Sequence, residues 1–186
     1  MKRRGITLIE LLITMALLGI ISAVITSVYV TGFKTFQEEL ASSTVQSSSQ
    51  TILDALITDT KNGLLIEESY DTYITSENTI IIRLPAVDDD KNILYDGSTM
   101  LFDRIIYYYA GNTIHKIVFA DPESSRYSKN GIDTVLDKKI LALSFAYEPN
   151  ASAATLITAT ISSEIKVGNK TRAITVTGQA RLRNHI

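Results

Sequence analysis

The feature that most constrains this chain is an uncharged apolar run near its N-terminus. No Asp, Glu, Lys or Arg occurs from Leu11 to Phe33. As a helix rising ~1.5 Å per residue, this run spans roughly 35 Å, enough to cross a hydrocarbon core of about 30 Å. Lys2, Arg3 and Arg4 precede the run. Because positive charge is retained in the cytoplasm, we expect one pass through a membrane with the rest of the chain outside.

The remainder of the sequence is typical of a globular domain without a strong charge bias. The net charge is -2, so a basic field for nucleic acid is absent. The chain has no cysteine, which excludes a disulfide framework and a Cys-based metal site. His115 and His185 are too few for a His-rich metal site, and no Gly-rich phosphate loop occurs. We therefore predict no enzymatic activity, no cofactor and no bound metal.

Glu10 is the exception at the head of the apolar run, five residues past Gly5. A carboxylate inside a bilayer costs ~2.5–3.5 kcal/mol and usually has a partner. Two interpretations remain open from position alone. The carboxylate either finds a partner in an apolar environment, or it lies at the interface and reaches back to headgroup level.

The segment Arg4–Leu12, with the sequence RGITLIELL, resembles the processing motif of type IV prepilins and type II secretion pseudopilins. In that family a membrane aspartyl peptidase cuts after the glycine and methylates the new N-terminus. The resemblance implies cleavage after Gly5, methylation of Ile6, and a leader charged by the basic residues before Gly5. It also implies an assembly role for Glu10, paired with the N-terminal amine of a neighbouring subunit. Ile6 departs from the family's usual first mature residue, Phe.

The same resemblance implies the chain's function, partners and location. It implies a filament subunit that contacts other pilin or pseudopilin subunits, the prepilin peptidase, an assembly platform and, before assembly, membrane lipid. The filament would be extracellular or periplasmic. The ending Ala180–Asn184 resembles J-type pseudopilins and W-type minor pilins, which favours a minor pilin. The alternatives are a pseudopilin of a type II secretion or competence system, and a membrane-anchored binding protein that never enters a filament.

A secretory signal peptide is the rival interpretation of the N-terminus. Leu11–Ile21 would be its apolar core, with cleavage after Ala23. Glu10 immediately before that core fits poorly, as does Ile21 at a position where a small residue is preferred.

The apolar run is predicted to continue as one helix from Ile6 to Asn62, roughly 85 Å long at ~1.5 Å per residue. Gly63 offers a stop, and no proline occurs before Pro85. A flexible linker at Ser42–Gln50 is the alternative, because serine lowers helix propensity. A stripe at three- and four-residue steps, with an apolar flank beside it, is expected to bring the outer half of the helix onto a head domain. The stripe is Phe33, Phe36, Leu40, Thr44, Ser47, Thr51, Ala55 and Thr58, and the flank is Leu53, Leu56 and Ile57.

Past Gly63 the apolar pattern changes to the two-residue period of strands. Residues 79–84, 104–109, 113–119 and 140–147 are predicted strands, and 121–134 is a predicted loop. A last hairpin around Gly168-Asn169 sets Ile161 opposite Val176 and Ile157 opposite Ala180, so that one face packs on the helix and the other faces water.

These patterns predict an α+β fold, with a long N-terminal transmembrane-plus-stalk helix packed on a C-terminal antiparallel β head. The expected divisions are a leader (1–5), a transmembrane and assembly segment (6–33), an amphipathic stalk (34–62) and the head (63–186).

Three further sets of residues are weighed as sites. Asp88–Asp90 is read as a solvated turn rather than a calcium site, because the EF-hand spacing is lacking. Tyr107–Tyr109 is expected to alternate between two faces of a strand. A DNA-binding patch is not expected, because no aromatic residues interleave the basic ones, which are Arg172, Arg181 and Arg183.

Overall fold

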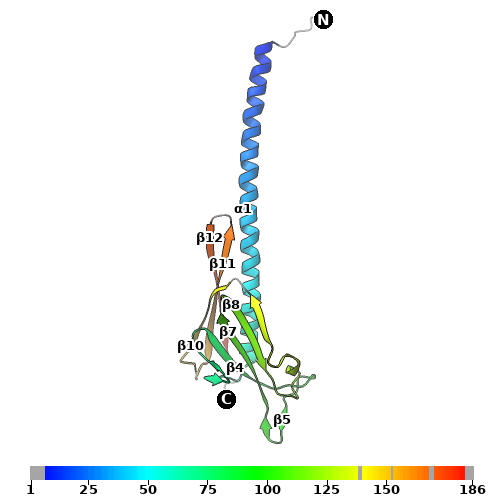
Figure 1. The fold of residues 1–186 in the computed structure, drawn as a ribbon, viewed down its shortest axis with the longest axis vertical. Helices are drawn as coiled ribbons and strands as arrows, with labels where there is room; N and C mark the ends of the chain where they lie inside the picture. The colour runs from blue at the N-terminus through cyan, green and yellow to red at the C-terminus, as the bar shows by residue number, and fades with distance from the viewer. Residues whose placement is uncertain (1–6, 138–139, 152, 168–169, 183–186) are drawn as a thin grey trace. The chain divides into compact units, whose positions relative to one another are not determined.

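The structure, a computed structural model, describes residues 7–137, 140–151, 153–167 and 170–182. The chain divides into two compact units, Met1–Ala41 and Ser42–Ile186, and each is described by itself. Figure 1 gives the order of the helix and strands along the chain.

Helix α1 runs without interruption from Leu8 to Asn62, 55 residues. This confirms the prediction of a single helix and rules out the linker at Ser42–Gln50. The helix ends at Gly63, whose N–H donates to the carbonyl oxygen of Thr60 at 3.0 Å. A Cβ at position 63 would lie 2.7 Å from Cγ2 of Ile82. Glycine therefore ends the helix where the chain passes too close to a strand for any side chain.

The serine-rich part of α1 packs on the head, because two of its hydroxyls find partners there. Ser49 is fully buried, and its Oγ lies 2.7 Å from Oγ of Ser163. Ser48 donates to Asp137 at 2.9 Å. The predicted flank supplies the packed face, whereas the members of the stripe from residue 44 to 58 are exposed. The buried residues of the helix are Ser49, Ile52, Leu53, Leu56 and Thr60.

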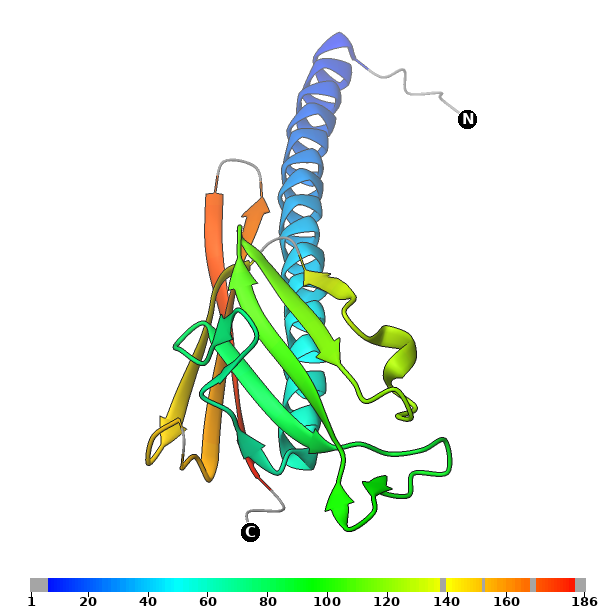
Figure 2. The ribbon, with the colours of Figure 1, turned by 60° about the horizontal axis from the view of Figure 1, so that its bottom comes forward.

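The head contains two antiparallel sheets rather than one, and Figure 2 shows both beside the C-terminal part of α1. The larger sheet has the order β1-β4-β7-β8-β9, and the smaller has the order β10-β11-β12. Two short hairpins, β2–β3 and β5–β6, complete the described strands. The bounds are β1 Leu65–Ile66, β2 Ser69–Tyr70, β3 Tyr73–Ile74, β4 Thr79–Pro85, β5 Tyr95–Asp96, β6 Thr99–Met100, β7 Phe102–Ala110, β8 Thr113–Phe119, β9 Asp133–Asp137, β10 Ile140–Glu148, β11 Leu156–Val167 and β12 Lys170–Arg181.

The predicted register of the last hairpin is confirmed. Ile161 pairs with Val176 and Ile157 with Ala180, and all four side chains are buried. The intervening positions of β12 are mostly exposed, as the alternation predicts. The turn itself, Gly168-Asn169, lies outside the described residues. In the β7–β8 hairpin, two successive positive φ angles fit a type I′ turn: 58° at Gly111 and 61° at Asn112.

Both faces of the larger sheet are buried in part. Its inner face joins α1 and the smaller sheet in the main core, through residues such as Ile80 and Ile82. Its outer face carries a second cluster, in which Ile81 and Ile106 are fully buried and Tyr70 and Tyr73 of the β2–β3 hairpin pack against them. The continuous Ile-Ile-Ile run at 80–82 was the sequence signal for a strand buried on both faces.

The predicted loop at 121–134 contains the short 3₁₀ helix η1 (Tyr127–Lys129) and the start of β9. Strand β9 was missed because its exposed residues carry no alternation. Its position follows from pairing with β8, which sets His115 opposite Val135.

A first prediction concerns Gly178, where β12 packs closely against α1. A Cβ at this position would collide with Cδ1 of Ile57 and lie 3.1 Å from Cδ2 of Leu53. Gly178→Ala should lower the free energy of unfolding by about 1–3 kcal/mol, the usual cost of overpacking a core. Urea denaturation of the chain without residues 1–34 measures this. The matched control is Thr171→Ala on the exposed part of the same strand, which should stay within about 0.5 kcal/mol of the parent. Equal stability of the two variants would contradict the described contact between β12 and the helix.

Candidate assembly site at the N-terminus of α1

The N-terminus of α1 is closed by a reciprocal pair of side chains. The Thr7 N–H and the Thr7 hydroxyl donate to Oε2 of Glu10 at 3.0 and 3.1 Å. The Glu10 N–H donates back to Oγ1 of Thr7 at 3.4 Å. This is a capping box, which satisfies backbone donors that have no partner inside a helix. Glu10 thus caps its own helix through one carboxylate oxygen.

Glu10 is the one predicted site residue that the structure describes, and it is exposed. The predicted cleavage and methylation pair, Gly5 and Ile6, lies outside the described residues. The same holds for the leader charges Lys2, Arg3 and Arg4. Thr7 was missed by the sequence reasoning, although the pattern Thr7-x-x-Glu10 before an apolar run is the usual capping-box signal.

The helix beyond Glu10 presents apolar side chains outward. Within the described residues, α1 is the one helix long and apolar enough to cross a membrane, with a mean hydropathy of 2.5 in its most apolar window. None of that window is buried within the chain. Leu12, Leu18 and Ile25, for example, are all more than half exposed. These apolar faces therefore require lipid or other helices to cover them.

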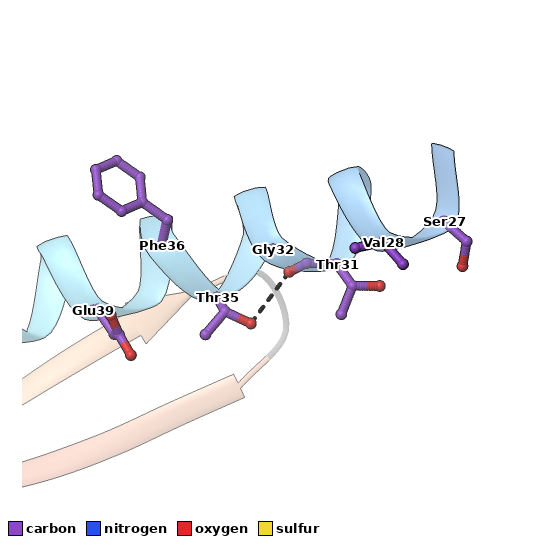
Figure 3. A pocket seen from close by; sticks show the side chains of 7 residues that line it. All are labelled: Ser27, Val28, Thr31, Gly32, Thr35, Phe36 and Glu39. Carbon is purple, nitrogen blue, oxygen red and sulfur yellow. Dashed lines mark hydrogen bonds between the residues drawn. The ribbon is translucent and has the colours of Figure 1, made fainter. Parts of the chain in front are cut away.

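Further along α1, small polar residues recur at every fourth position. Ser27, Thr31 and Thr35 follow this spacing, and Figure 3 shows Thr35 and Glu39 on the opposite side of the helix from Phe36. The Thr35 hydroxyl donates to the carbonyl oxygen of Thr31 at 3.2 Å, so its polar group is satisfied within the helix. Small side chains at this spacing allow close approach of a second helix.

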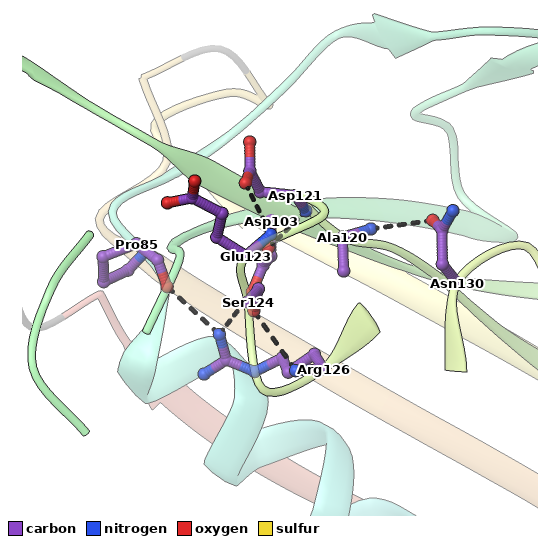
Figure 4. Close-up of polar contacts among 8 residues, drawn as sticks. All are labelled: Pro85, Asp103, Ala120, Asp121, Glu123, Ser124, Arg126 and Asn130. Atoms are coloured by element: carbon purple, nitrogen blue, oxygen red, sulfur yellow. Dashed lines mark hydrogen bonds and ion pairs between the residues drawn. The ribbon is translucent and has the colours of Figure 1, made fainter. Parts of the chain in front are cut away.

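Among the described residues of the head, the most buried charged side chain is that of Asp103 on β7, which is 0% exposed. Its carboxylate accepts the backbone N–H of Asp121 at 2.9 Å, the hydroxyl of Ser124 at 2.7 Å, and Nη1 of Arg126 at 2.7 Å (Figure 4). Arg126 Nη1 also donates to the carbonyl oxygen of Pro85 at 3.1 Å. All the carboxylate's partners come from the loop that leads to β9, so the cluster fastens that loop to the sheet.

The predicted alternation of the three tyrosines on β7 is confirmed. Tyr107 is buried on the inner face and donates to Asp59 at 2.6 Å. Burial, and then the negative charge of Asp59, raises the pKa of Tyr107, so the phenol stays protonated. Tyr108 points to the outer face, stacks on His115 and donates to Asp133 at 2.8 Å.

A groove of ≈ 390 Å³ in the head lies between α1 and strands β7–β9. Ile52, Ala55 and Leu136 supply apolar walls, and Lys116 lies among the lining residues. The Lys116 ammonium is already paired with Asp59 at 2.6 Å. The positive charge of Lys116 in this groove is thus balanced by the carboxylate of Asp59.

The residues weighed above for calcium and DNA binding lie in the head domain. Asp88 accepts the backbone N–H and the side-chain amide of Asn92, which lowers the pKa of that carboxyl and closes a turn. The part of the chain that the structure describes has no cluster of three or more metal-ligating side chains. Arg172 and Arg181 lie nine positions apart on β12, roughly 30 Å at about 3.3 Å per residue, so these two do not form a patch. Arg183 lies outside the described residues.

The comparisons with known proteins bear on the N-terminus. The family described as the prokaryotic N-terminal methylation motif matches residues 1–26. No curated protein and no solved structure matches the chain. The motif belongs to structural proteins, implies assembly with other pilin subunits, and together with the apolar helix suggests anchoring in a membrane. Residues 1–26 therefore carry the prepilin-type methylation motif, which indicates a type IV pilin-like or pseudopilin subunit that a prepilin peptidase processes.

Proposed function

We propose that this chain is a minor subunit of a type IV pilus or a related filament. Prepilin peptidase cuts between Gly5 and Ile6 and methylates Ile6. The segment 6–33 holds the subunit in the inner membrane, with its N-terminus cytoplasmic and its head outside. The same segment then carries the subunit into the filament. The observation that supports this most is the methylation motif at residues 1–26, together with the exposed, charge-free helical surface from Leu11 to Phe33 that overlaps it.

The proposed assembly step uses Glu10. Both hydrogen bonds from Thr7 end on Oε2, so Oε1 points to no described donor of the same chain. That second oxygen can accept the N-terminal amine of a neighbouring subunit. Pairing the two charges reduces the cost of placing both in an apolar filament core, and it sets the axial register between helices that otherwise present uniform apolar surfaces.

Processing is testable by itself. Expression with prepilin peptidase should yield a mature chain that begins at N-methylated Ile6, as intact-mass and peptide mass spectrometry would show. The matched control is Gly5→Leu, which places a bulky side chain at the cleavage site and should leave the leader attached. A mature chain that begins at Val24 would instead support a secretory signal peptide.

A further inference from the structure

An aromatic pair occupies the outer end of the charge-free run. Tyr29 is 71% exposed and Phe33 is 53% exposed, and their rings stack at a centroid distance of 6.4 Å. Lys34 follows directly, and the acidic pair Glu38-Glu39 lies one turn further on. Tyrosine has an apolar ring and a polar tip, and this combination favours the boundary between hydrocarbon and headgroups.

The distance from Glu10 to Tyr29 matches a bilayer. At about 1.5 Å per residue the helix rises roughly 28 Å between them, close to the hydrocarbon thickness of about 30 Å. If the hydrocarbon instead extended to Phe33, the phenol of Tyr29 would lie about 6 Å below the boundary. It would then be in a region where a hydroxyl donor is costly.

The capped end of α1 also belongs at a boundary. The first backbone N–H groups of any helix lack intrahelical partners, and such groups are not stable in hydrocarbon. Here Thr7 and Glu10 satisfy some of them, and water or headgroups must satisfy the rest. Because the helix begins at Leu8, the Glu10 carboxylate lies at headgroup level rather than in the hydrocarbon core of the bilayer.

Between the two boundaries, the hydroxyls of Thr14 and Thr26 find their acceptors within the helix itself. The Thr14 hydroxyl donates to the carbonyl oxygens of Glu10 and Leu11 at 3.0 and 2.9 Å. The Thr26 hydroxyl donates to the carbonyl oxygen of Ser22 at 2.8 Å. These bonds lower the cost of burying the hydroxyls in lipid.

From these observations we infer that Tyr29 and Phe33 anchor the membrane-resident subunit at the outer interface. Only Leu11–Val28 then crosses the hydrocarbon. Glu10 stays at the inner headgroup level until the subunit enters the filament. The inference rests on the proposed membrane anchoring. It shortens the spanning segment expected from charge alone, which ended at Phe33. Assembly, rather than insertion, is then the step that moves the Glu10 carboxylate into an apolar environment.

The chain contains no tryptophan, so one introduced tryptophan reports its own depth. The full chain carrying Tyr29→Trp, Ile20→Trp or Ile9→Trp would be reconstituted into phosphatidylethanolamine–phosphatidylglycerol vesicles. Part of the phosphatidylethanolamine would be brominated either near the glycerol end of its acyl chains or near their middle. Bromine quenches tryptophan fluorescence at short range, so the ratio of quenching by the two lipids gives the depth.

We expect bromine near the glycerol end (shallow) to quench the tryptophans at positions 29 and 9 more strongly than bromine near the middle of the chains (deep) does. The tryptophan at position 20 should show the opposite order. If bromine near the middle of the acyl chains quenches the tryptophan at position 29 as strongly as the one at position 20, the anchor at Tyr29 is overturned. Deep quenching at position 9 would overturn the placement of Glu10. Absence of quenching at position 20 with either lipid would mean that the helix does not insert, and the proposed anchoring itself would then fail.

Discussion

Replacing Glu10 with leucine is expected to remove the subunit from filaments while leaving it in the membrane. The apolar run supplies the span without Glu10, so insertion and processing should continue. In the filament, however, the neighbour's amine would be left buried and unpaired, which costs roughly 3–5 kcal/mol. If entry into the filament is near equilibrium, occupancy should fall by more than about a hundredfold. The measurement compares the amount of subunit in sheared filaments with the amount in membranes of the native host.

The structure supplies a control that separates charge from capping. Glu10→Gln keeps an oxygen that can accept the Thr7 donors, but it has no charge to offer an amine. It should therefore lose incorporation nearly as strongly as the leucine variant, and Glu10→Asp should fall between, because its charge is kept while its reach is shorter. Normal incorporation of both uncharged variants would exclude the pairing mechanism. Equal loss from filaments and membranes would point to failed insertion instead.

Asp103→Asn should destabilise the head domain strongly. The carboxylate is fully buried and accepts three donors, two of them uncharged and one from Arg126. The amide keeps one acceptor and turns its own N–H donors toward groups that also donate. Because Arg126 is partly exposed and can reach water, we expect the lower end of the cost of breaking a buried pair, about 3 kcal/mol. Urea denaturation of the chain without residues 1–34 measures it.

A matched substitution isolates the effect of burial. Asp90→Asn makes the same chemical change on an exposed loop and should alter the unfolding free energy by less than about 0.5 kcal/mol. Combining Asp103→Asn with Arg126→Gln should cost clearly less than the sum of the two single changes, since both remove the same contact. Additive costs would show that the two side chains do not interact and that the loop is held by something else.

Periodicity carried most of the fold prediction. The charge-free run and Gly63 gave the helix and its end at Asn62, and the alternation around Ile161 and Val176 gave the register of the last hairpin. Both signals depend on local order, because a period of 3.6 or 2 is read within one segment. The division into two sheets depends instead on contacts between distant segments, and the residue pattern within one segment does not show which distant strands pair.

Two local features were misjudged for identifiable reasons. The three- and four-residue stripe through Thr51 and Ala55 proved to be exposed, because the packed face of α1 uses Ser49 and Thr60 beside the leucines. A polar residue can be buried when it has a hydrogen-bond partner, as Ser49 has in Ser163, and hydropathy alone does not predict such a buried position. At the candidate site, Glu10 was identified from position and resemblance, whereas its contact with Thr7 required recognition of a capping box.

The most direct test of the account is the location of the mature chain in cells. Filaments sheared from the native host should contain this subunit at low copy number relative to the major pilin, beginning at N-methylated Ile6 when analysed by quantitative mass spectrometry. Deletion of prepilin peptidase should abolish that peptide and leave the unprocessed chain in the membrane. Recovery of the subunit from membranes alone, in cells whose filaments form normally and contain none of it, would contradict its role as a filament component.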